Sequence, residues 1–223
     1  MAATPPSTPF PWEGTAERAD RFLFAGIIFS GLYALALLPA VPALIGTHPV
    51  LLEVFRGSMT SMVTMGALAR EGEASLAVAF FAGLPGTMMF DWLYWWAGRR
   101  WGERGLMTLV GNHPKGPARV AKVRRLAERF GAPGVVFAYI QPLPTALIYA
   151  AAGWTGMRLA TFLVLDLIGS MIWVGLMVGL GFAVGEPVVD VAKAISRYAL
   201  LFTVALIAVI VARSVWRERR AGT

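Results

Sequence analysis

The sequence predicts an all-α integral membrane protein, built as an inverted repeat of two re-entrant hairpins that are each followed by a transmembrane helix, with further transmembrane helices at its N- and C-terminal ends. Three observations predict this fold class. Long apolar stretches recur along the 223 residues, basic residues gather in two segments, and the two halves of the chain match each other at a shift of 83 positions.

The composition excludes an ordinary soluble domain. The chain is 57% hydrophobic and only 15% charged, and its mean hydropathy is +0.63. One soluble core would not use so many apolar side chains, so the surplus must face something other than water. The sequence holds no cysteine, which excludes disulfides, thiol catalysis and cysteine metal sites.

Four stretches are long and apolar enough to cross a membrane, because a helix needs roughly 20 mostly apolar residues to cross a hydrocarbon core about 30 Å thick. In chain order they are residues 22–45, residues 76–98 with Asp91 among them, residues 159–184, and residues 198–212 extended back towards Val188. We expect the first to be a retained span rather than a signal peptide, since its apolar run is too long and no clear small-residue cleavage site follows it.

Two further apolar segments fit poorly as straight spans. Residues 50–69 contain two charged side chains and a run of hydroxyl groups, and residues 132–153 contain three prolines. A segment that enters and leaves the membrane by the same side, with its turn buried in protein, accommodates both. In the second segment we expect Pro142, Pro144 and Gly153 to shape the hairpin, because proline removes a backbone donor and ends a helix.

The placement of charge predicts the orientation. Residues 99–129 carry nine Lys or Arg against two Glu, and four arginines follow residue 212. Positive-inside counting places both regions in the cytoplasm, so the chain is predicted to be a multi-pass cell-membrane protein with cytoplasmic N- and C-termini. The predicted parts are a tail at 1–21, a single membrane domain at 22–212 with a basic cytoplasmic loop at 99–131, and a basic tail at 213–223.

The basic loop also contains a predicted helix. Val120, Val123, Ala127 and Phe130 recur at helical spacing, with basic residues at the other positions. Such a helix lies either on the inner membrane surface or in solvent. The net charge of +7 does not indicate nucleic-acid binding, because the positive charges flank apolar spans, where a membrane surface explains them better.

The internal match supports a repeated architecture. A shift of 83 positions places residues 76–102 over residues 159–185 without a gap, and several identities coincide, among them Gly86 with Gly169 and Gly98 with Gly181. A broken segment precedes each matched span, so hairpin plus span occurs twice. With the orientation taken from the charges, the first copy enters from outside and the second from inside, which makes the repeat inverted.

Particular residues carry a resemblance to a known family. In the second half they are Pro142, the pair Ala152 and Gly153 followed by Met157, and Phe162 leading to Gly169 and Trp173; in the first half they are Asp91, Gly98, Arg99, Arg100 and Gly102. On these residues the chain resembles the DedA family, whose domain is also described as the VTT or SNARE-associated Golgi protein domain. The resemblance covers about residues 50–185.

The resemblance implies a membrane protein with two re-entrant hairpins that meet in the bilayer. Bacterial members are associated with moving lipid phosphates, notably the polyprenyl-phosphate carrier of cell-wall synthesis, between leaflets, and with dependence on the proton gradient. Eukaryotic relatives are described as phospholipid scramblases. The chain departs from the family pattern at three places: Tyr139 and Thr145 stand where the family usually has arginines, and Thr60 stands where it usually has an acid.

Polar side chains inside apolar segments are the candidate site residues, because charge in a membrane is costly and usually functional. The predicted substrate-binding or transport residues are Glu53, Arg56, Asp91, Arg99, Gln141, Thr145 and Asp166. Arg56 contacts a lipid phosphate, pairs with Glu53, or extends its charged end to the membrane interface. Asp91 and Asp166 either take a direct part in transport, Asp166 by carrying a proton, or they hydrogen-bond a neighbouring helix or cap a hairpin turn.

Three functions are compatible with these residues. The first is a lipid transporter that moves a lipid phosphate, such as polyprenyl phosphate, or a phospholipid between leaflets, with proton coupling left open. The second is a membrane organiser or partner-binding protein that keeps the fold without transporting. The third, a membrane enzyme, is disfavoured because no histidine pairs with an acid or nucleophile. We predict no catalytic residues, cofactor, metal or nucleic-acid partner; the partners are membrane lipids, and homo-oligomerisation is left open.

Overall fold

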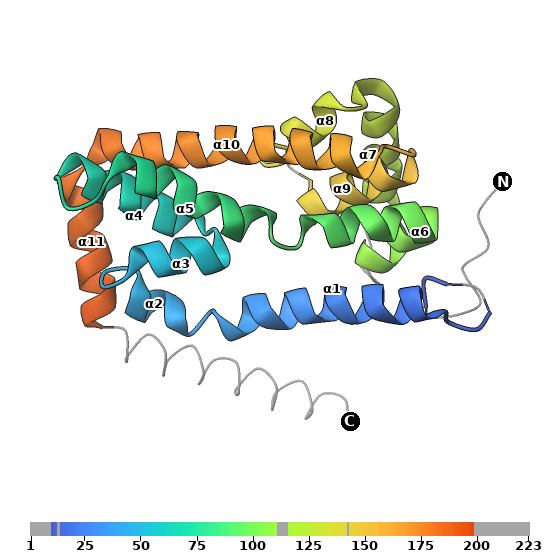
Figure 1. The fold of residues 1–223 in the computed structure, drawn as a ribbon, viewed down its shortest axis with the longest axis horizontal. Coiled ribbons are helices and arrows are strands. Elements are labelled where there is room, and N and C mark those ends of the chain that lie inside the picture. The colour runs from blue at the N-terminus through green and yellow to red at the C-terminus, as the bar shows by residue number, and fades with distance from the viewer. Residues whose placement is uncertain (1–9, 13, 111–115, 142, 199–223) are drawn as a thin grey trace. The chain divides into compact units, whose positions relative to one another are not determined.

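The computed structural model of the chain describes residues 10–12, 14–110, 116–141 and 143–198. Every regular element in these ranges is an α-helix (Figure 1), which confirms the all-α prediction. In chain order the helices are α1 (Arg18–Ala36), α2 (Ala40–Leu44), α3 (Pro49–Arg56), α4 (Met59–Arg70), α5 (Leu76–Met88), α6 (Asp91–Val110), α7 (Gly116–Phe130), α8 (Pro133–Val136), α9 (Thr145–Trp154), α10 (Leu159–Val184) and α11 (Glu186–Arg197).

Three helical stretches are long and apolar enough to cross a membrane. They are α1, the α5–α6 stretch at Leu76–Leu109, and α10. The bounds of α10 are those that the sequence predicted. Its outward side chains are apolar, with Val164 57% and Leu180 49% exposed, and such a surface suits lipid rather than water. These features indicate a membrane protein.

The predicted first span, residues 22–45, is shorter than expected. α1 begins earlier, at Arg18, and ends at Ala36, and a turn at residues 37–39 separates it from the short helix α2. Pro39 and Pro42 lie in this stretch, and a proline has no N–H to continue the hydrogen-bond ladder of a helix.

The predicted last span is described only at its beginning. Residues 186–197 form a separate helix, α11, which is amphipathic: Val189 and Ala192 are buried, whereas Asp190 and Lys193 are exposed. The remainder of the predicted span, from residue 199 onward, lies outside the described residues.

The predicted span at residues 76–98 is two helices rather than one. Pro85 lies inside α5, and a turn at Met89 and Phe90 separates α5 from α6. α6 continues into the predicted basic loop as far as Val110, with a kink at Gly102, where φ is +57°. The break leaves the carbonyl end of α5 next to the first residue of α6, as in discontinuous membrane helices.

The described residues up to Leu32, together with those between Thr87 and Trp173, form one compact unit, here called the Asp91 unit. α6 and α9 pack closely in it: Gly98 of α6 lies against the backbone of Ala150, and Gly153 of α9 lies against the backbone of Trp95. Glycine allows this approach because a side chain at either place would collide with the neighbouring backbone.

The predicted helix in the basic loop is confirmed as α7. Val120 is 3% exposed and Val123 1% exposed, and both join the buried cluster that contains Leu106 of α6 and Leu147 of α9. The apolar face of α7 therefore packs on protein.

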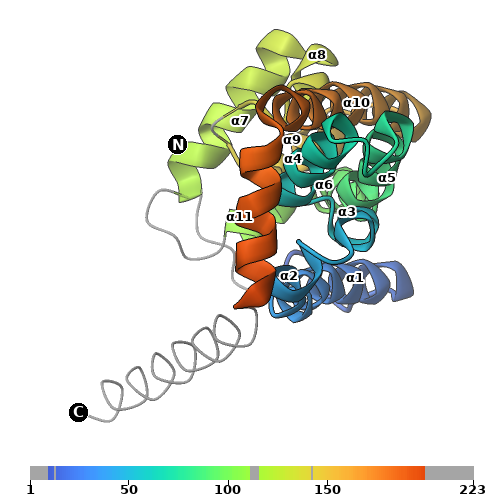
Figure 2. The same ribbon diagram turned by 90° about the vertical axis from the view of Figure 1, so that its left-hand side faces the viewer.

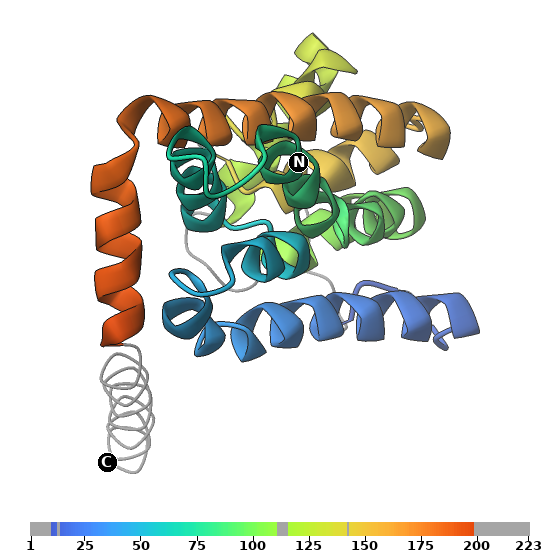
Figure 3. The ribbon, with the colours of Figure 1, turned by 60° about the vertical axis from the view of Figure 1, so that its left-hand side comes forward.

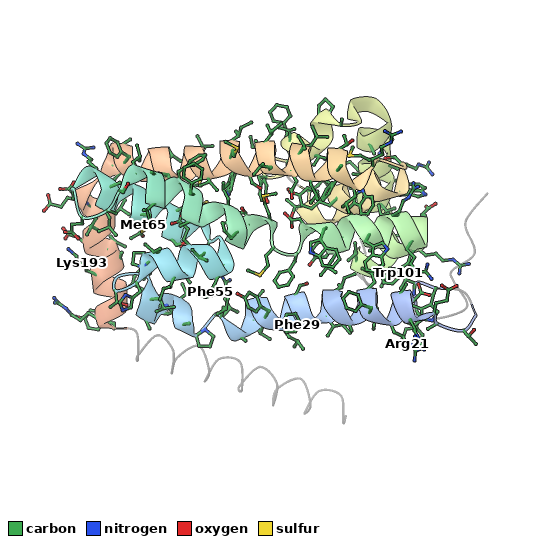
Figure 4. All side chains as sticks on the ribbon, viewed as in Figure 1. Arg21, Phe29, Phe55, Met65, Trp101 and Lys193 are labelled. Atoms are coloured by element: carbon green, nitrogen blue, oxygen red, sulfur yellow. The ribbon has the colours of Figure 1, made fainter. Side chains whose placement is uncertain are left out.

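An ionic clamp joins α1 to α6 in the same unit. The guanidinium of Arg100 donates to both carboxylate oxygens of Asp20, at 2.6 and 3.0 Å, and to Glu17 at 2.6 Å. Trp101 Nε1 donates to Asp20 at 2.8 Å. Figure 4 shows Trp101 between the two helices, and the clamp fixes the start of α1 against α6 through charge-assisted hydrogen bonds.

Among the described residues, Tyr33–Gly86 and those from Val174 to Tyr198 form the other compact unit, here called the Glu53 unit. α4 packs on the C-terminal half of α10, with Gly66 against the backbone of Val178 and Gly181 against the backbone of Val63. α11 turns away from the end of α10 and runs past α4 to α2 (Figures 2 and 3).

Candidate functional site

A polar cluster in the Asp91 unit brings together two predicted site residues from distant parts of the chain. Asp91 is the first residue of α6, directly after the break that follows α5. Asp166 lies in α10, and Ser170 lies one turn further along the same face. Tyr139 comes from the segment between α8 and α9, and Tyr149 comes from α9.

Tyr139 connects the parts of this cluster. Its hydroxyl lies 3.1 Å from Asp91 Oδ2, to which it donates, 3.4 Å from Ser170 Oγ and 3.5 Å from the carbonyl oxygen of Thr87. Its ring stacks on Trp173, with the ring centres 5.8 Å apart and the planes at 15°. The stacking fixes the ring, so the hydroxyl is held beside Asp91.

Asp166 and Tyr149 are fully buried, and their polar ends have no hydrogen bond of ordinary geometry. Both side chains are 0% exposed, and neither carboxyl oxygen of Asp166 nor the hydroxyl of Tyr149 has a hydrogen-bond partner among the described residues. Both nevertheless lie near Asp91, and their electrostatic interactions link all three. Buried polar groups are normally hydrogen-bonded, so this cluster is an exception that requires an explanation.

A second buried carboxyl group lies in the Glu53 unit. Glu53 is 0% exposed, and neither of its carboxyl oxygens has a hydrogen-bond partner among the described residues. Its Oε1 lies beside Gly83 of α5, at 3.1 Å from the place where a Cβ would be, and methyl groups of Val174 are next to the same place. Burial removes the carboxyl from water, which disfavours its charged form and raises the pKa of Glu53 to about 8.

Arg56 does not neutralise Glu53. The guanidinium is half-buried, and its Nη1 donates to the carbonyl oxygen of Ala34 at 3.0 Å. The two carboxyl oxygens of Glu53 have no described partner, so the predicted alternative of a Glu53–Arg56 ion pair is wrong. The other two alternatives for Arg56, a contact with a phosphate and extension to the membrane interface, stay predictions.

The remaining predicted residues are spread through the Asp91 unit. Arg99 is exposed on α6, near Gly156. The amide of Gln141 donates to the Gly134 carbonyl at 3.4 Å, and its Oε1 is buried without a described partner. Thr145 is the first residue of α9.

The predicted hairpin-shaping residues have different positions. Pro144 is the cap residue directly before α9, and its ψ of 124° is the extended backbone usual at that position. Gly153 lies inside α9 and serves the packing against α6 rather than a turn. Pro142 lies outside the described residues.

Sequence reasoning missed two members of the cluster, Tyr149 and Ser170. Ser170 follows Asp166 by four residues, which places both on one helical face, so its presence was a usable signal. Tyr149 gave no comparable signal, because a tyrosine in an apolar helix is most often a packing residue.

The Glu53 unit also contains two adjoining cavities between α4 and α11. One, of about 390 Å³, is almost entirely apolar and includes Val63 and Val191 in its lining. The other, of about 300 Å³, is more polar and includes His48, Glu73 and Lys193. Figure 4 shows Lys193 on α11, where it forms an ion pair with Glu73 at 3.6 Å.

The described residues bring together no group of three or more His, Cys, Asp or Glu side chains of the kind that holds a metal ion. The cluster around Asp91 is therefore a pair of carboxyl groups with hydroxyl and carbonyl oxygens. Oxygen ligands of this kind can hold a proton or a hard cation.

Comparison with known proteins adds the family. The model of the VTT domain matches residues 55–183, which is more than half of the chain and contains Asp91, Tyr139, Tyr149, Asp166 and Ser170. No curated protein and no solved structure matched the chain. The match agrees with the resemblance found in the sequence, and the chain belongs to the family of the VTT domain, the DedA or SNARE-associated family of membrane proteins.

Proposed function

We propose that this chain moves a phosphate-bearing lipid, such as polyprenyl phosphate or a phospholipid, between the two leaflets of the cell membrane, and that it is not an enzyme. One observation carries the proposal: each compact unit buries a carboxyl group that has no hydrogen-bond partner of ordinary geometry among the described residues, Glu53 beside α5 and Asp166 within α10. Under the shift of 83 positions Gly83, which neighbours the Glu53 carboxyl, corresponds to Asp166. Ionisable groups at such places are expensive and are typical of transport pathways.

The correspondence between the two units is supported by contacts that glycines make with the backbones of neighbouring helices. Gly86 of α5 lies against the backbone of Glu53 and Gly57 in one unit, and Gly169 of α10 lies against the backbone of Val136 in the other. The shift of 83 positions converts the Gly86–Glu53 contact into the Gly169–Val136 contact. Under the same shift, Gly83, which neighbours the Glu53 carboxyl, corresponds to Asp166.

Further contacts repeat in the same way. Gly98 and Gly181 differ by 83 positions, and each lies against the backbone of the last helix of a broken segment, α9 in one unit and α4 in the other. Gly102 and Gly185 also correspond, and both adopt a positive φ. These contacts support two copies of hairpin plus span, and the charge-based orientation supports their inversion and cytoplasmic termini.

Two features favour a lipid with a phosphate group. The apolar cavity between α4 and α11 has the character that an acyl or polyprenyl chain requires. Arg56 has one described hydrogen bond, through Nη1, and a guanidinium has five N–H donors with which to bind an anionic oxygen.

The test is leaflet exchange in proteoliposomes, using a fluorescent phospholipid and, separately, a polyprenyl phosphate, each with and without a proton gradient. We expect exchange from the native chain, and its loss in Glu53→Gln and Asp91→Asn protein that is shown to be folded. Asp190→Asn, which changes an exposed carboxyl on α11, is the matched control and should retain exchange. Exchange that survives both substitutions would remove the buried carboxyl groups from the mechanism.

A second function is favoured by Tyr139 and Thr145, which stand where the family usually has arginines. In this alternative the chain keeps the fold as a membrane organiser or partner-binding protein and moves no lipid. No exchange of either lipid by folded native protein would support it and contradict the transport proposal.

A further inference from the structure

α7 presents a basic face that no described part of the chain neutralises. The sequence of this helix, Gly116–Phe130, contains five Lys or Arg and one Glu. Lys122 and Arg125 are exposed, Arg119 is half-buried, and none of the three has a hydrogen-bond or ion-pair partner among the described residues. Their positive charges are therefore available to a partner outside the chain.

The opposite face of α7 is already occupied by protein. Val120 and Val123 are 3% and 1% exposed, and they pack in the buried cluster that α7 forms with α6 and α9. At 3.6 residues per turn, Lys122 and Arg125 project from the side of the helix away from these valines. A helix inserts into a membrane surface through its apolar face. Because that face of α7 is buried in protein, charge is what α7 offers to a partner.

The side chains between the basic residues indicate the class of partner. Ala118 and Ala121 are exposed there, and no aromatic or large aliphatic side chain is exposed among the described side chains of α7. Protein partners are usually held by aromatic or large apolar anchors, whereas a surface of anionic lipid attracts Lys and Arg by charge alone. Residues 111–115 alone separate α7 from α6, which belongs to a candidate span, so α7 begins within about 20 Å of the end of α6. Anionic lipid is therefore the complementary partner within reach.

We propose that the basic face of α7, formed by Arg119, Lys122 and Arg125, binds the negatively charged head groups of phospholipids and enriches these lipids beside the Asp91 unit. The charge-based orientation places them in the cytoplasmic leaflet. The contact is electrostatic and does not require α7 to insert, because the apolar face of the helix packs on α6 and α9. The inference stands apart from the proposed transport function, because the bound lipids need not cross the membrane.

The test measures which lipids lie next to α7 in the full chain, reconstituted in nanodiscs of phosphatidylcholine and phosphatidylglycerol. The chain has no cysteine, so Ala121→Cys carries a single fluorophore on the basic face. A spin label high on the acyl chain quenches a nearby fluorophore, and it is placed on the anionic lipid in one sample and on the neutral lipid in another. The ratio of the two quenching efficiencies gives the local enrichment of anionic lipid. We expect at least about fivefold enrichment at low salt, the contribution of one basic residue.

Two variants and a second label position isolate the charge of α7. Lys122→Glu combined with Arg125→Glu should abolish the enrichment, whereas Lys122→Arg combined with Arg125→Lys, which keeps the charge, should leave it unchanged. Both positions are exposed, so we expect both variants to fold, as judged by helical circular dichroism. A fluorophore at Ala194→Cys on α11 is the matched control, since that helix carries two acidic and two basic residues and should show no enrichment.

The salt dependence separates an electrostatic contact from insertion. At an ionic strength of about 1 M the Debye length is about 3 Å, so the enrichment should disappear. Enrichment that survives this ionic strength, or that persists in folded protein with both charges reversed, would contradict an electrostatic contact with the basic face. Equal quenching by the two lipids in the Ala121→Cys chain would show that α7 selects no anionic lipid, and the inference would be overturned. None of these outcomes depends on leaflet exchange, so they leave the test of transport unaffected.

Discussion

Glu53 is a single buried side chain on which both the proposed function and the pH dependence of stability depend. It lies in an apolar environment with no described partner, beside the glycine that makes room for it. The sequence identified Glu53 as a candidate because a charge is rare in an apolar segment. It could not show that Arg56 turns away to the carbonyl of Ala34, because that depends on which helix each side chain faces.

The raised pKa of Glu53 predicts that stability depends on pH. The pKa rises from its ordinary value near 4.5 to about 8, so between these values the folded chain keeps a proton that the unfolded chain has released. Stability therefore falls as the pH rises through this range. We expect Glu53→Gln to remove part of this dependence, so that the variant is the more stable protein above about pH 8.

The measurement is the thermal unfolding midpoint of native and variant protein in detergent over a pH series. Glu103→Gln, at an exposed position, is the control and should follow the native curve. Parallel curves for the native chain and Glu53→Gln would show that Glu53 is not protonated within the fold.

At the scale of helices, glycines determine which faces meet. Gly181 of α10 touches the backbone of Val63, whereas Gly179, two residues earlier on the same helix, has nothing within 4 Å of where its Cβ would be. The sequence predicted the span itself from its apolar length. It could not tell these two glycines apart, because only the packed structure shows which one faces α4.

The pair makes a matched test of packing. We expect Gly181→Ala to destabilise the chain by about 1–3 kcal/mol or more, since the added methyl meets backbone that cannot move aside. Gly179→Ala should stabilise α10 by about 0.5–1 kcal/mol, the ordinary advantage of alanine over glycine in a helix. Thermal or denaturant unfolding in detergent measures both, and equal effects would exclude close contact between α4 and α10.

The clamp between α1 and α6 gives a second test at this scale. Asp20 accepts hydrogen bonds from Arg100 and Trp101 and is 4% exposed. Asp20→Asn removes the charge and half of the acceptor capacity, so we expect a loss of about 1–3 kcal/mol of unfolding free energy. Asp190→Asn, at an exposed position, should cost little. No difference between the two variants would mean that the clamp does not stabilise the fold.

For the whole molecule, the sequence predicted more of the helices than of the contacts between them. The bounds of α10, the helix α7 and the family were all accessible from pattern and motif. The break between α5 and α6 was missed, because the apolar pattern runs straight through it. Asp91 and Asp166 were each singled out, but their proximity joins residues 75 positions apart and is a property of the tertiary fold alone.

Orientation in the membrane can be tested on the intact molecule, because the chain has no cysteine to interfere with labelling. We expect Glu186→Cys, at the start of α11, to react with a membrane-impermeant maleimide on intact cells. Lys122→Cys, on α7 in the basic loop, should react only after the membrane is opened. The reverse pattern would invert the charge-based topology, and equal labelling of both variants would contradict any fixed orientation.

The buried carboxyl group beside Gly83 has a consequence for how such a sequence can change in evolution. In the proposed repeat, Gly83 corresponds to Asp166, yet each half has a carboxyl group there, supplied by the preceding helical segment in one half and by the span in the other. If the two halves arose by duplication, they kept a buried charge while exchanging the residue that supplies it. An alignment of the two half-sequences pairs a glycine with an aspartate at this position, so it would indicate that the first half has lost the acid. A superposition of the two halves in three dimensions would instead show that both retain a buried carboxyl group.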